Sequence, residues 1–227
     1  MQLHKKTRAL LIILGVLLGC TAMACFEMVR QPSYFVKAVI KFLLFGLIIL
    51  GTCLVSRDAS FLQNFRWQGK RHFLRALCLG IATFALILAG FYVCRHFINL
   101  KTIAHDLIHD ENITARNFLP VSVYICLVNS FLEEIFFRGF AYLELRRFVP
   151  EPVASAVSIL TFSAYHIAII SGWFSPWIAL LILSGLAISG WIFNRLDRCG
   201  SLYPSWIVHM SANAAINLIG LMMFGYL

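Results

Sequence analysis

Long apolar runs, separated by short polar loops, dominate the pattern of this chain. About 20 consecutive apolar residues cross the hydrocarbon core of a bilayer as a helix. The runs lack the strict alternation of apolar and polar residues that marks a transmembrane β-barrel. The sequence therefore predicts an all-α fold, a polytopic membrane helix bundle of about seven or eight transmembrane helices. The predicted spans lie near residues 9–28, 34–55, 73–94, 119–147, 153–170, 177–193 and 204–227.

Composition agrees with a protein that lives in lipid. Of the 227 residues, 60% are hydrophobic and only 13% are charged, whereas soluble globular proteins have roughly 25% charged residues. No linker or internal repeat divides the chain, so we expect a single integral membrane domain over residues 1–227. The first apolar run follows a basic N-terminus, as in a signal peptide, but it continues further and more spans follow, which favours an uncleaved first helix.

The formal net charge of +9 does not indicate nucleic-acid binding, because the basic residues cluster in short loops beside apolar runs. That distribution is the positive-inside pattern of membrane proteins. It predicts a cytoplasmic N-terminus and, as the most plausible location, a bacterial cytoplasmic membrane. Three basic residues depart from the pattern and are expected on or near the outer side: Arg30, Lys37 and Lys41.

Cysteines and one histidine pair offer metal ligands in principle. The seven cysteines form no C-x-x-C pair and mostly lie within apolar runs, so we expect buried, reduced thiols that act as small apolar residues. His105 and His109 are one helical turn apart. Their acidic neighbours, however, indicate a solvated amphipathic stretch in preference to a metal site.

Ionisable residues interrupt the fourth span. Charged side chains at such depth cost a few kcal/mol on insertion scales (about 3), so they persist mainly where they are paired or functional. Glu134 and Arg138 are four residues apart and suit an ion pair. Glu133 is rotated by about 100° from Glu134 and has no obvious cation. We therefore interpret Glu133 as a candidate general base and Glu134 with Arg138 as supporting residues.

Two later spans carry polar residues at helical spacing. Phe162 and His166 are four apart, as are His209 and Asn213, so each pair shares one face of its helix. If these helices meet the fourth span, Glu133 and His166 could activate a water molecule. His209 and Asn213 could then stabilise the oxyanion of a tetrahedral intermediate. Phe162 would pack beside His166 and exclude water.

The same groups leave a metal mechanism open. Glu133, His166 and His209 could bind Zn²⁺ and leave a position for water. No H-E-x-x-H or G-x-S-x-G motif is present. We favour a metal-free site without a cofactor, because Asn213 suits oxyanion donation better than zinc ligation. Asn129 and Asn217 are expected to be structural.

Together these motifs resemble a known family. Glu133-Glu134-x-x-x-Arg138, Phe162-x-x-x-His166 and His209-x-x-x-Asn213 are similar in order and spacing to the motifs of the CAAX protease and bacteriocin-processing (CPBP, or Abi) family. The resemblance covers a motif-bearing core of about residues 119–220. It implies an intramembrane endopeptidase in which Glu133 and His166 activate water, and His209 and Asn213 form the oxyanion hole.

Two other classes of function remain open from the sequence. Buried Glu and His residues would also serve a small proton-coupled transporter, and a non-catalytic membrane partner such as an immunity protein would keep the same fold. The expected partners are the bilayer and a membrane-associated peptide or protein. A prenylated C-terminus fits a host that prenylates proteins, whereas a leader peptide or bacteriocin fits a bacterium. The sequence does not indicate an oligomeric state.

Overall fold

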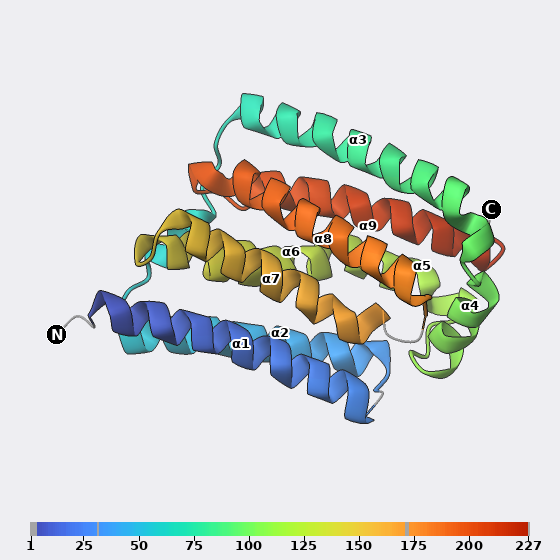
Figure 1. Ribbon diagram of the computed structural model, residues 1–227, viewed down its shortest axis with the longest axis horizontal. Coiled ribbons are helices and arrows are strands. Elements are labelled where there is room, and N and C mark those ends of the chain that lie inside the picture. Colours follow the sequence, from blue (N-terminus) through green and yellow to red (C-terminus); the bar gives the residue numbers. More distant parts are fainter. Residues whose placement is uncertain (1–3, 31, 171–172, 227) are drawn as a thin grey trace.

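The computed structural model describes residues 4–30, 32–170 and 173–226. These residues form a bundle of long helices that run back and forth along one axis (Figure 1). Within the described residues the only β contact is an isolated antiparallel bridge between Phe65 and Ser201. The prediction of an all-α fold is therefore confirmed.

Among the described residues, seven helices are long and apolar enough to cross a membrane, judged by length and composition. The number and order match the predicted spans, with ends that differ by a few residues. Six of the seven are α1 (Lys5–Arg30), α2 (Tyr34–Ser56), α3 (Lys70–Cys94), α7 (Glu151–Ile170), α8 (Pro176–Leu196) and α9 (Tyr203–Met223). The remaining span, Ala115–Arg147, is composite.

This composite span changes its hydrogen bonding along its length. It contains α5 (Ala115–Tyr124), a π-helical segment (Ile125–Asn129), α6 (Ser130–Glu133), a second π-helical segment (Glu134–Glu144) and a final 3₁₀ turn (Leu145–Arg147). Its start is fixed by a capping box between Thr114 and Asn117, which satisfies free backbone groups of the first turn. π-Helical segments often occur at functional sites, and here the change from α to π falls between Glu133 and Glu134.

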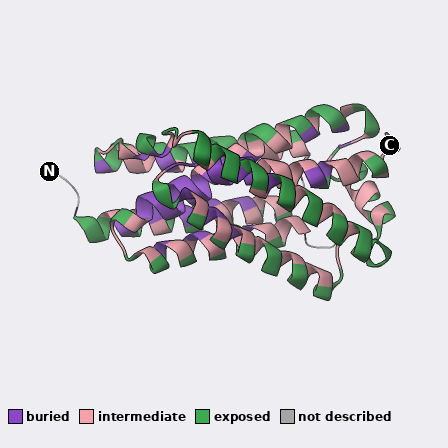
Figure 2. Cartoon of the chain, turned by 90° about the horizontal axis from the view of Figure 1, so that it is seen from above, coloured by how far each residue is buried: buried purple, intermediate pink, exposed green. Residues whose placement is uncertain are grey.

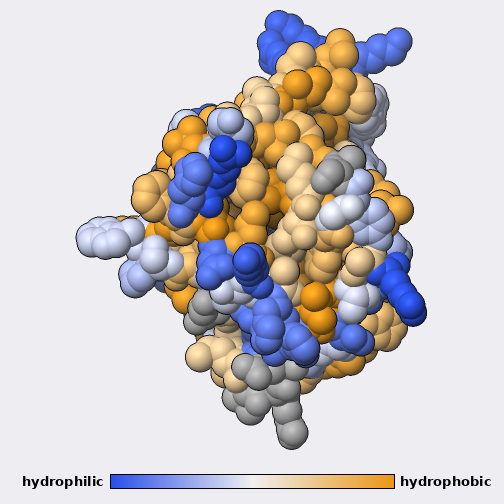
Figure 3. Space-filling model, turned by 90° about the vertical axis from the view of Figure 1, so that its right-hand side faces the viewer, coloured by the Kyte–Doolittle hydropathy of each residue, from blue (hydrophilic) through white to orange (hydrophobic). Residues whose placement is uncertain are grey.

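Charged residues gather at the two ends of the bundle. The end that carries the N-terminus holds most of the basic residues, namely Lys5, Lys6, Arg8, Arg57, Arg66, Lys70, Arg71, Arg75, Arg146, Arg147, Arg195 and Arg198. The opposite end carries the short helix α4 (Leu100–His109) and mixes hydrophilic with hydrophobic residues (Figure 3). The two ends thus differ in charge as the positive-inside rule expects of a membrane protein.

Helix α4 behaves as the sequence predicted. His105 and His109 are exposed on its surface, and their ring centroids lie 4.3 Å apart. His105 Nδ1 lies 3.3 Å from the carboxylate of its neighbour Asp106. The pair therefore belongs to a polar, exposed helix face.

Ion pairs connect neighbouring segments at each end of the bundle. At the basic end, Arg8 of α1 binds Asp58 at 2.5 Å, and the backbone N–H of Ser60 donates to the same carboxylate at 2.8 Å. At the opposite end, Lys37 of α2 binds Glu27 at 2.5 Å and also contacts Glu111. These contacts tie loops and helix ends to the first two helices.

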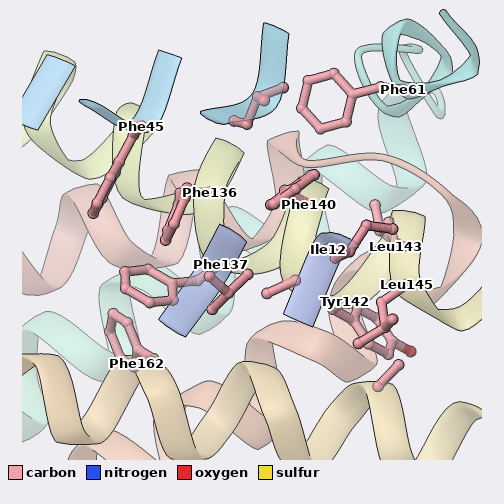
Figure 4. Packing of buried hydrophobic residues seen from close by; sticks show 14 of the residues in the cluster. Ile12, Phe45, Phe61, Phe136, Phe137, Phe140, Tyr142, Leu143, Leu145 and Phe162 are labelled. Carbon is pink, nitrogen blue, oxygen red and sulfur yellow. The ribbon is translucent and has the colours of Figure 1, made fainter. Parts of the chain in front are cut away.

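The core is aromatic and lies where α1, α2 and α7 meet the second π-helical segment (Figure 4). The rings of Phe45 and Phe136 stack with centroids 3.7 Å apart, and Phe137 meets Phe162 edge-on at 5.3 Å. A Cβ atom on Gly19 would lie 2.7 Å from Phe136. A Cβ atom on Gly15, four residues earlier, would lie 2.9 Å from Ile48, so these two glycines allow close helix packing.

Outside this core the helices expose apolar side chains. Buried residues concentrate inside the bundle and toward its N-terminal end, while outward faces are exposed (Figure 2). Such a surface suits lipid contact, because lipid tails are as apolar as the side chains themselves. The cysteines correct one expectation. All seven are free thiols, but none is fully buried, and Cys25, Cys78 and Cys199 are exposed.

Candidate active site

His209 of α9 lies between the two adjacent glutamates of the composite span. Its Nδ1 is 2.7 Å from Glu134 Oε1, and its Nε2 is 3.7 Å from Glu133 Oε2. All three side chains are buried. The structure therefore brings the predicted glutamates and His209 together. The interpretation needs one correction, because Glu134 contacts this imidazole in addition to its predicted partner Arg138.

A second correction concerns the charge balance of Glu133. The sequence offered no cation for this carboxylate and placed Lys41 near the outer side. In the structure Lys41 of α2 is buried, and its Nζ lies 3.0 Å from Glu133 Oε1. Asn129, one turn earlier on the composite span, donates to the same oxygen at 3.1 Å and accepts from Lys41 at 2.8 Å. The expectation failed because Lys41 is remote in sequence from every motif.

Glu134 forms the predicted pair with Arg138. Arg138 Nε lies 3.4 Å from Glu134 Oε2, and both side chains are fully buried. Among the described residues, no side-chain nitrogen of Arg138 makes a hydrogen bond. Its guanidinium instead lies 4.0 Å from the ring centre of Phe162 and 4.8 Å from that of Phe193. Aromatic faces attract a desolvated cation, so one carboxylate and two rings stabilise the Arg138 guanidinium.

His166 has a defined orientation on α7. Its Nδ1 lies 2.8 Å from the carbonyl oxygen of Phe162, and only an N–H can donate to a carbonyl. In the neutral ring, Nε2 is then the nitrogen that can accept a proton. The Phe162 ring lies edge-on to His166 at 4.7 Å and to His209 at 6.1 Å. Phe162 therefore packs against both imidazoles, as its spacing predicted for His166.

The asparagines differ in their environments. Asn213 Nδ2 donates to the carbonyl of Ile125 at 3.2 Å, in the first π-helical segment. This uses one of its two N–H groups. Asn217, one turn later, donates to the carbonyl of Ser122 at 3.4 Å and lies 3.3 Å from the thiol of Cys126. Asn217 thus links two helices, as predicted.

Buried polar contacts fix how α7 and α9 meet the composite span. Ser158 of α7 donates to the carbonyl of Phe137 at 2.8 Å. The indole N–H of Trp206 of α9 donates to the hydroxyl of Ser130 at 3.0 Å. Because each bond joins a helix to the middle of the composite span, the positions of His166 and His209 follow from helix packing.

The start of α9 is anchored as well. The buried carboxylate of Asp197 accepts from the backbone N–H of Ser205 at 3.0 Å and from its hydroxyl at 2.5 Å. A carboxylate that accepts from a first-turn N–H stabilises a helix start. His209 lies one turn beyond Ser205, so this anchor also sets its depth. Asp197 was not among the site residues predicted from the sequence, and Lys41 was named there only as a basic residue near the outer side. The signal that could have assigned both residues to the site is their charge within or beside an apolar run.

The fit of a metal can be judged from the side chains present. Within the described residues, no group of three or more His, Cys, Asp and Glu side chains is arranged to hold a metal ion. The described side chains therefore do not form the three-ligand cage that a catalytic zinc site uses.

Comparison with known proteins adds independent support for a family. The family model described as type II CAAX prenyl endopeptidase Rce1-like matches residues 115–215. The matched residues include the composite span, α7, α8 and the first half of α9. No curated protein matched the chain, and no solved structure did. The family match supports a CAAX-type membrane protease in general, with a bilayer environment and a membrane-associated substrate. Residues 115–215 of this multi-pass membrane protein thus form an Rce1-like domain, as its motifs predicted.

Proposed function

We propose that the protein is an intramembrane endopeptidase that hydrolyses a peptide bond of a membrane-associated peptide or protein. The observation that carries the proposal is the buried cluster in which His209 contacts both Glu133 and Glu134 within the Rce1-like domain. Ionisable groups buried in a membrane bundle are expensive and are usually functional. The family match favours a protease over a transporter or a non-catalytic partner.

Glu133 is the general base in this proposal. Its Oε1 accepts from Lys41 and Asn129, so Oε2 is the oxygen available to a water molecule. Oε2 takes a proton from water as the hydroxide adds to the peptide carbonyl carbon. When the C–N bond breaks, the same proton passes to the leaving nitrogen, and Glu133 returns to its carboxylate form. His166 assists through Nε2, the nitrogen left free by the bond to Phe162.

His209 and Asn213 stabilise the oxyanion in this proposal. Nδ1 of His209 donates to Glu134, so a second proton on Nε2 makes the ring a cationic donor toward the developing negative charge. Asn213 keeps one N–H group beyond the one bound to Ile125. Removing one oxyanion donor typically lowers kcat by about 10²–10³. Glu134 and Arg138 support the site, because Glu134 orients the His209 ring.

Cleavage of labelled peptides by the purified protein in lipid vesicles tests the proposal. The panel contains membrane-anchored peptides with and without a prenylated C-terminus, each assayed with and without a chelator. We expect cleavage that resists the chelator and that Glu133→Gln abolishes. Glu144→Gln is the matched control, since Glu144 is a buried glutamate of the same span that pairs with Arg147 at 3.0 Å, away from His209.

The outcomes separate the mechanisms. A folded Glu133→Gln protein that still cleaves at the wild-type rate contradicts the role of Glu133. Cleavage that the chelator stops and Zn²⁺ restores contradicts the metal-free mechanism and returns Glu133, His166 and His209 to consideration as zinc ligands. An intact biological function in Glu133→Gln favours the non-catalytic partner.

A further inference from the structure

Lys41 is a buried cation that no motif of the sequence includes. It lies on α2, outside the matched residues 115–215, in a helix that is otherwise apolar in its middle. A lysine near a helix end in a membrane normally extends toward the interface. Lys41 instead points into the bundle, where Glu133, Asn129 and the ring face of Tyr165, 5.1 Å away, surround its ammonium group.

The contacts of Lys41 divide the two oxygens of Glu133. Oε1 accepts from Lys41 at 3.0 Å and from Asn129 at 3.1 Å. Oε2 makes neither contact and faces Nε2 of His209 at 3.7 Å. Two donors on one oxygen fix the rotation of a carboxylate, so the second oxygen has a defined direction. That oxygen points toward the imidazole at the centre of the site.

The second glutamate has the same arrangement. Glu134 has one oxygen beside Arg138 at 3.4 Å and the other beside His209 Nδ1 at 2.7 Å. Lys41 therefore supplies the counter-charge of Glu133 as Arg138 does for Glu134, and it also donates a hydrogen bond to its carboxylate, which Arg138 does not. Another difference is that Arg138 comes from the same span as its partner, whereas Lys41 comes from a helix of the first half of the chain.

A purely structural ion pair would explain Lys41 less well. Lys37, one turn earlier on the same helix, already ties α2 to neighbouring segments through Glu27 and Glu111. Lys41 instead contacts the one carboxylate proposed to activate water. Asn129 accepts from Lys41 and also donates to Glu133 Oε1, so it gives that oxygen a second hydrogen bond. An ion pair that only links two helices does not need this third residue.

We propose that Lys41 is a positioning residue for peptide hydrolysis: its ammonium group holds Glu133 with Oε1 occupied and Oε2 directed at the water. The role rests on the proposed function of Glu133. It also means that the site extends beyond the Rce1-like domain, since α2 supplies the counter-charge of the base. Misplacing a reacting group by about 1 Å lowers a rate by about 10²-fold.

The test compares Lys41→Met, Lys41→Arg and Lys37→Met in the full chain, with kcat and KM measured on a peptide that the wild type cleaves. We expect Lys41→Met to lose on the order of 10²-fold in kcat with KM nearly unchanged, as misplacement of a reacting group predicts. Lys41→Arg should recover most of this loss, because it keeps a cation in reach of Glu133. Lys37→Met should retain the wild-type kcat.

A second measurement does not depend on cleavage. The free energies of unfolding of Lys41→Met, Glu133→Gln and the double variant form a cycle that reports whether the two side chains are coupled. We expect the loss from Lys41→Met to shrink when Glu133 is already Gln. Additive losses overturn the pairing and with it the positioning role.

The remaining outcomes are distinct. If the wild type cleaves and Lys41→Met keeps its kcat, the positioning role is wrong while the proposed function stands. If Lys41→Met loses rate but Lys41→Arg recovers nothing, a positively charged partner at this position is not what Glu133 needs, and the role is again wrong. If the folded wild type cleaves no peptide of the panel, the proposed function fails and the role of Lys41 falls with it.

Discussion

The Arg138–Glu134 pair allows a sharp prediction about stability. Both side chains are fully buried, and Arg138 lies between the rings of Phe162 and Phe193. Arg138→Met removes the cation but keeps an unbranched apolar side chain against those rings. The carboxylate of Glu134 then remains buried with only His209 beside it. Breaking a buried pair in this way typically destabilises a protein by about 3–5 kcal/mol.

A double variant of the pair measures how much of that loss in the free energy of unfolding comes from the unpaired charge. In the double variant Arg138→Met/Glu134→Gln both charges are gone, and replacing a buried pair by uncharged residues of similar volume is often close to neutral. Loss of the contacts to the two rings still costs about 2 kcal/mol, the strength of a desolvated cation–π contact. We therefore expect the double variant to be more stable than Arg138→Met by about 2 kcal/mol, the difference between those two estimates.

Unfolding in mixed micelles with a rising fraction of denaturing detergent measures these free energies, and the five tryptophans supply the signal. The wild type, both single variants and the double variant complete the cycle. If the double variant is as unstable as the sum of the single variants, Arg138 and Glu134 are not coupled. The buried pair would then contribute by packing alone, and Glu134 would need another explanation for its orientation toward His209.

Two further predictions concern helix packing and pH. Gly19→Ala places a Cβ 2.7 Å from Phe136, so it should lower the free energy of unfolding by about 1–3 kcal/mol, as overpacking does. The control Gly46→Ala meets no atom within 4 Å and should be nearly neutral. Equal effects of the two variants would contradict the close packing of Gly19 against Phe136. Hydrogen bonds from Ser60 and Arg8 hold the pKa of Asp58 below its usual range. A lowered pKa stabilises the fold above the unfolded value of about 3.9 and loses that effect as pH falls further. The thermal stability of Asp58→Asn should therefore lie below that of the wild type at neutral pH and approach it in acid, and a gap that persists in acid would contradict this origin.

Sequence patterns were sufficient for the spans and for one half of the site. Each apolar run became a helix, because a bilayer requires every backbone hydrogen bond to be made within the segment. Spacing of four residues also predicted the Glu134–Arg138 pair and the packing of Phe162 beside His166. These features are local, so the geometry of a single helix determines them.

The contacts between different helices could not be predicted from the sequence. Lys41 and Glu133 are 92 residues apart, and no periodicity of either helix reveals that they meet. A carbonyl of its own helix fixes the tautomer of His166, but the position of neighbouring helices determines which groups its Nε2 faces. Likewise, the close approach of Gly19 to Phe136 needed the position of α1 against the composite span. The sequence motifs therefore indicated the residues of the site but not Lys41, the cation that pairs with Glu133.

The two glutamates show that helical phase alone does not predict which partners two adjacent residues share. Adjacent residues of a helix diverge by about 100°, which suggested that Glu133 and Glu134 serve different partners. His209 nevertheless contacts both glutamates, because its two ring nitrogens point in different directions and each nitrogen faces one carboxylate. What distinguishes the glutamates is then the cation on the far oxygen: Arg138 from the same span for Glu134, and Lys41 from α2 for Glu133. One cation thus lies beside each carboxylate, Lys41 beside Glu133 and Arg138 beside Glu134, and the two pairs flank one imidazole, so neither buried carboxylate is left without a counter-charge.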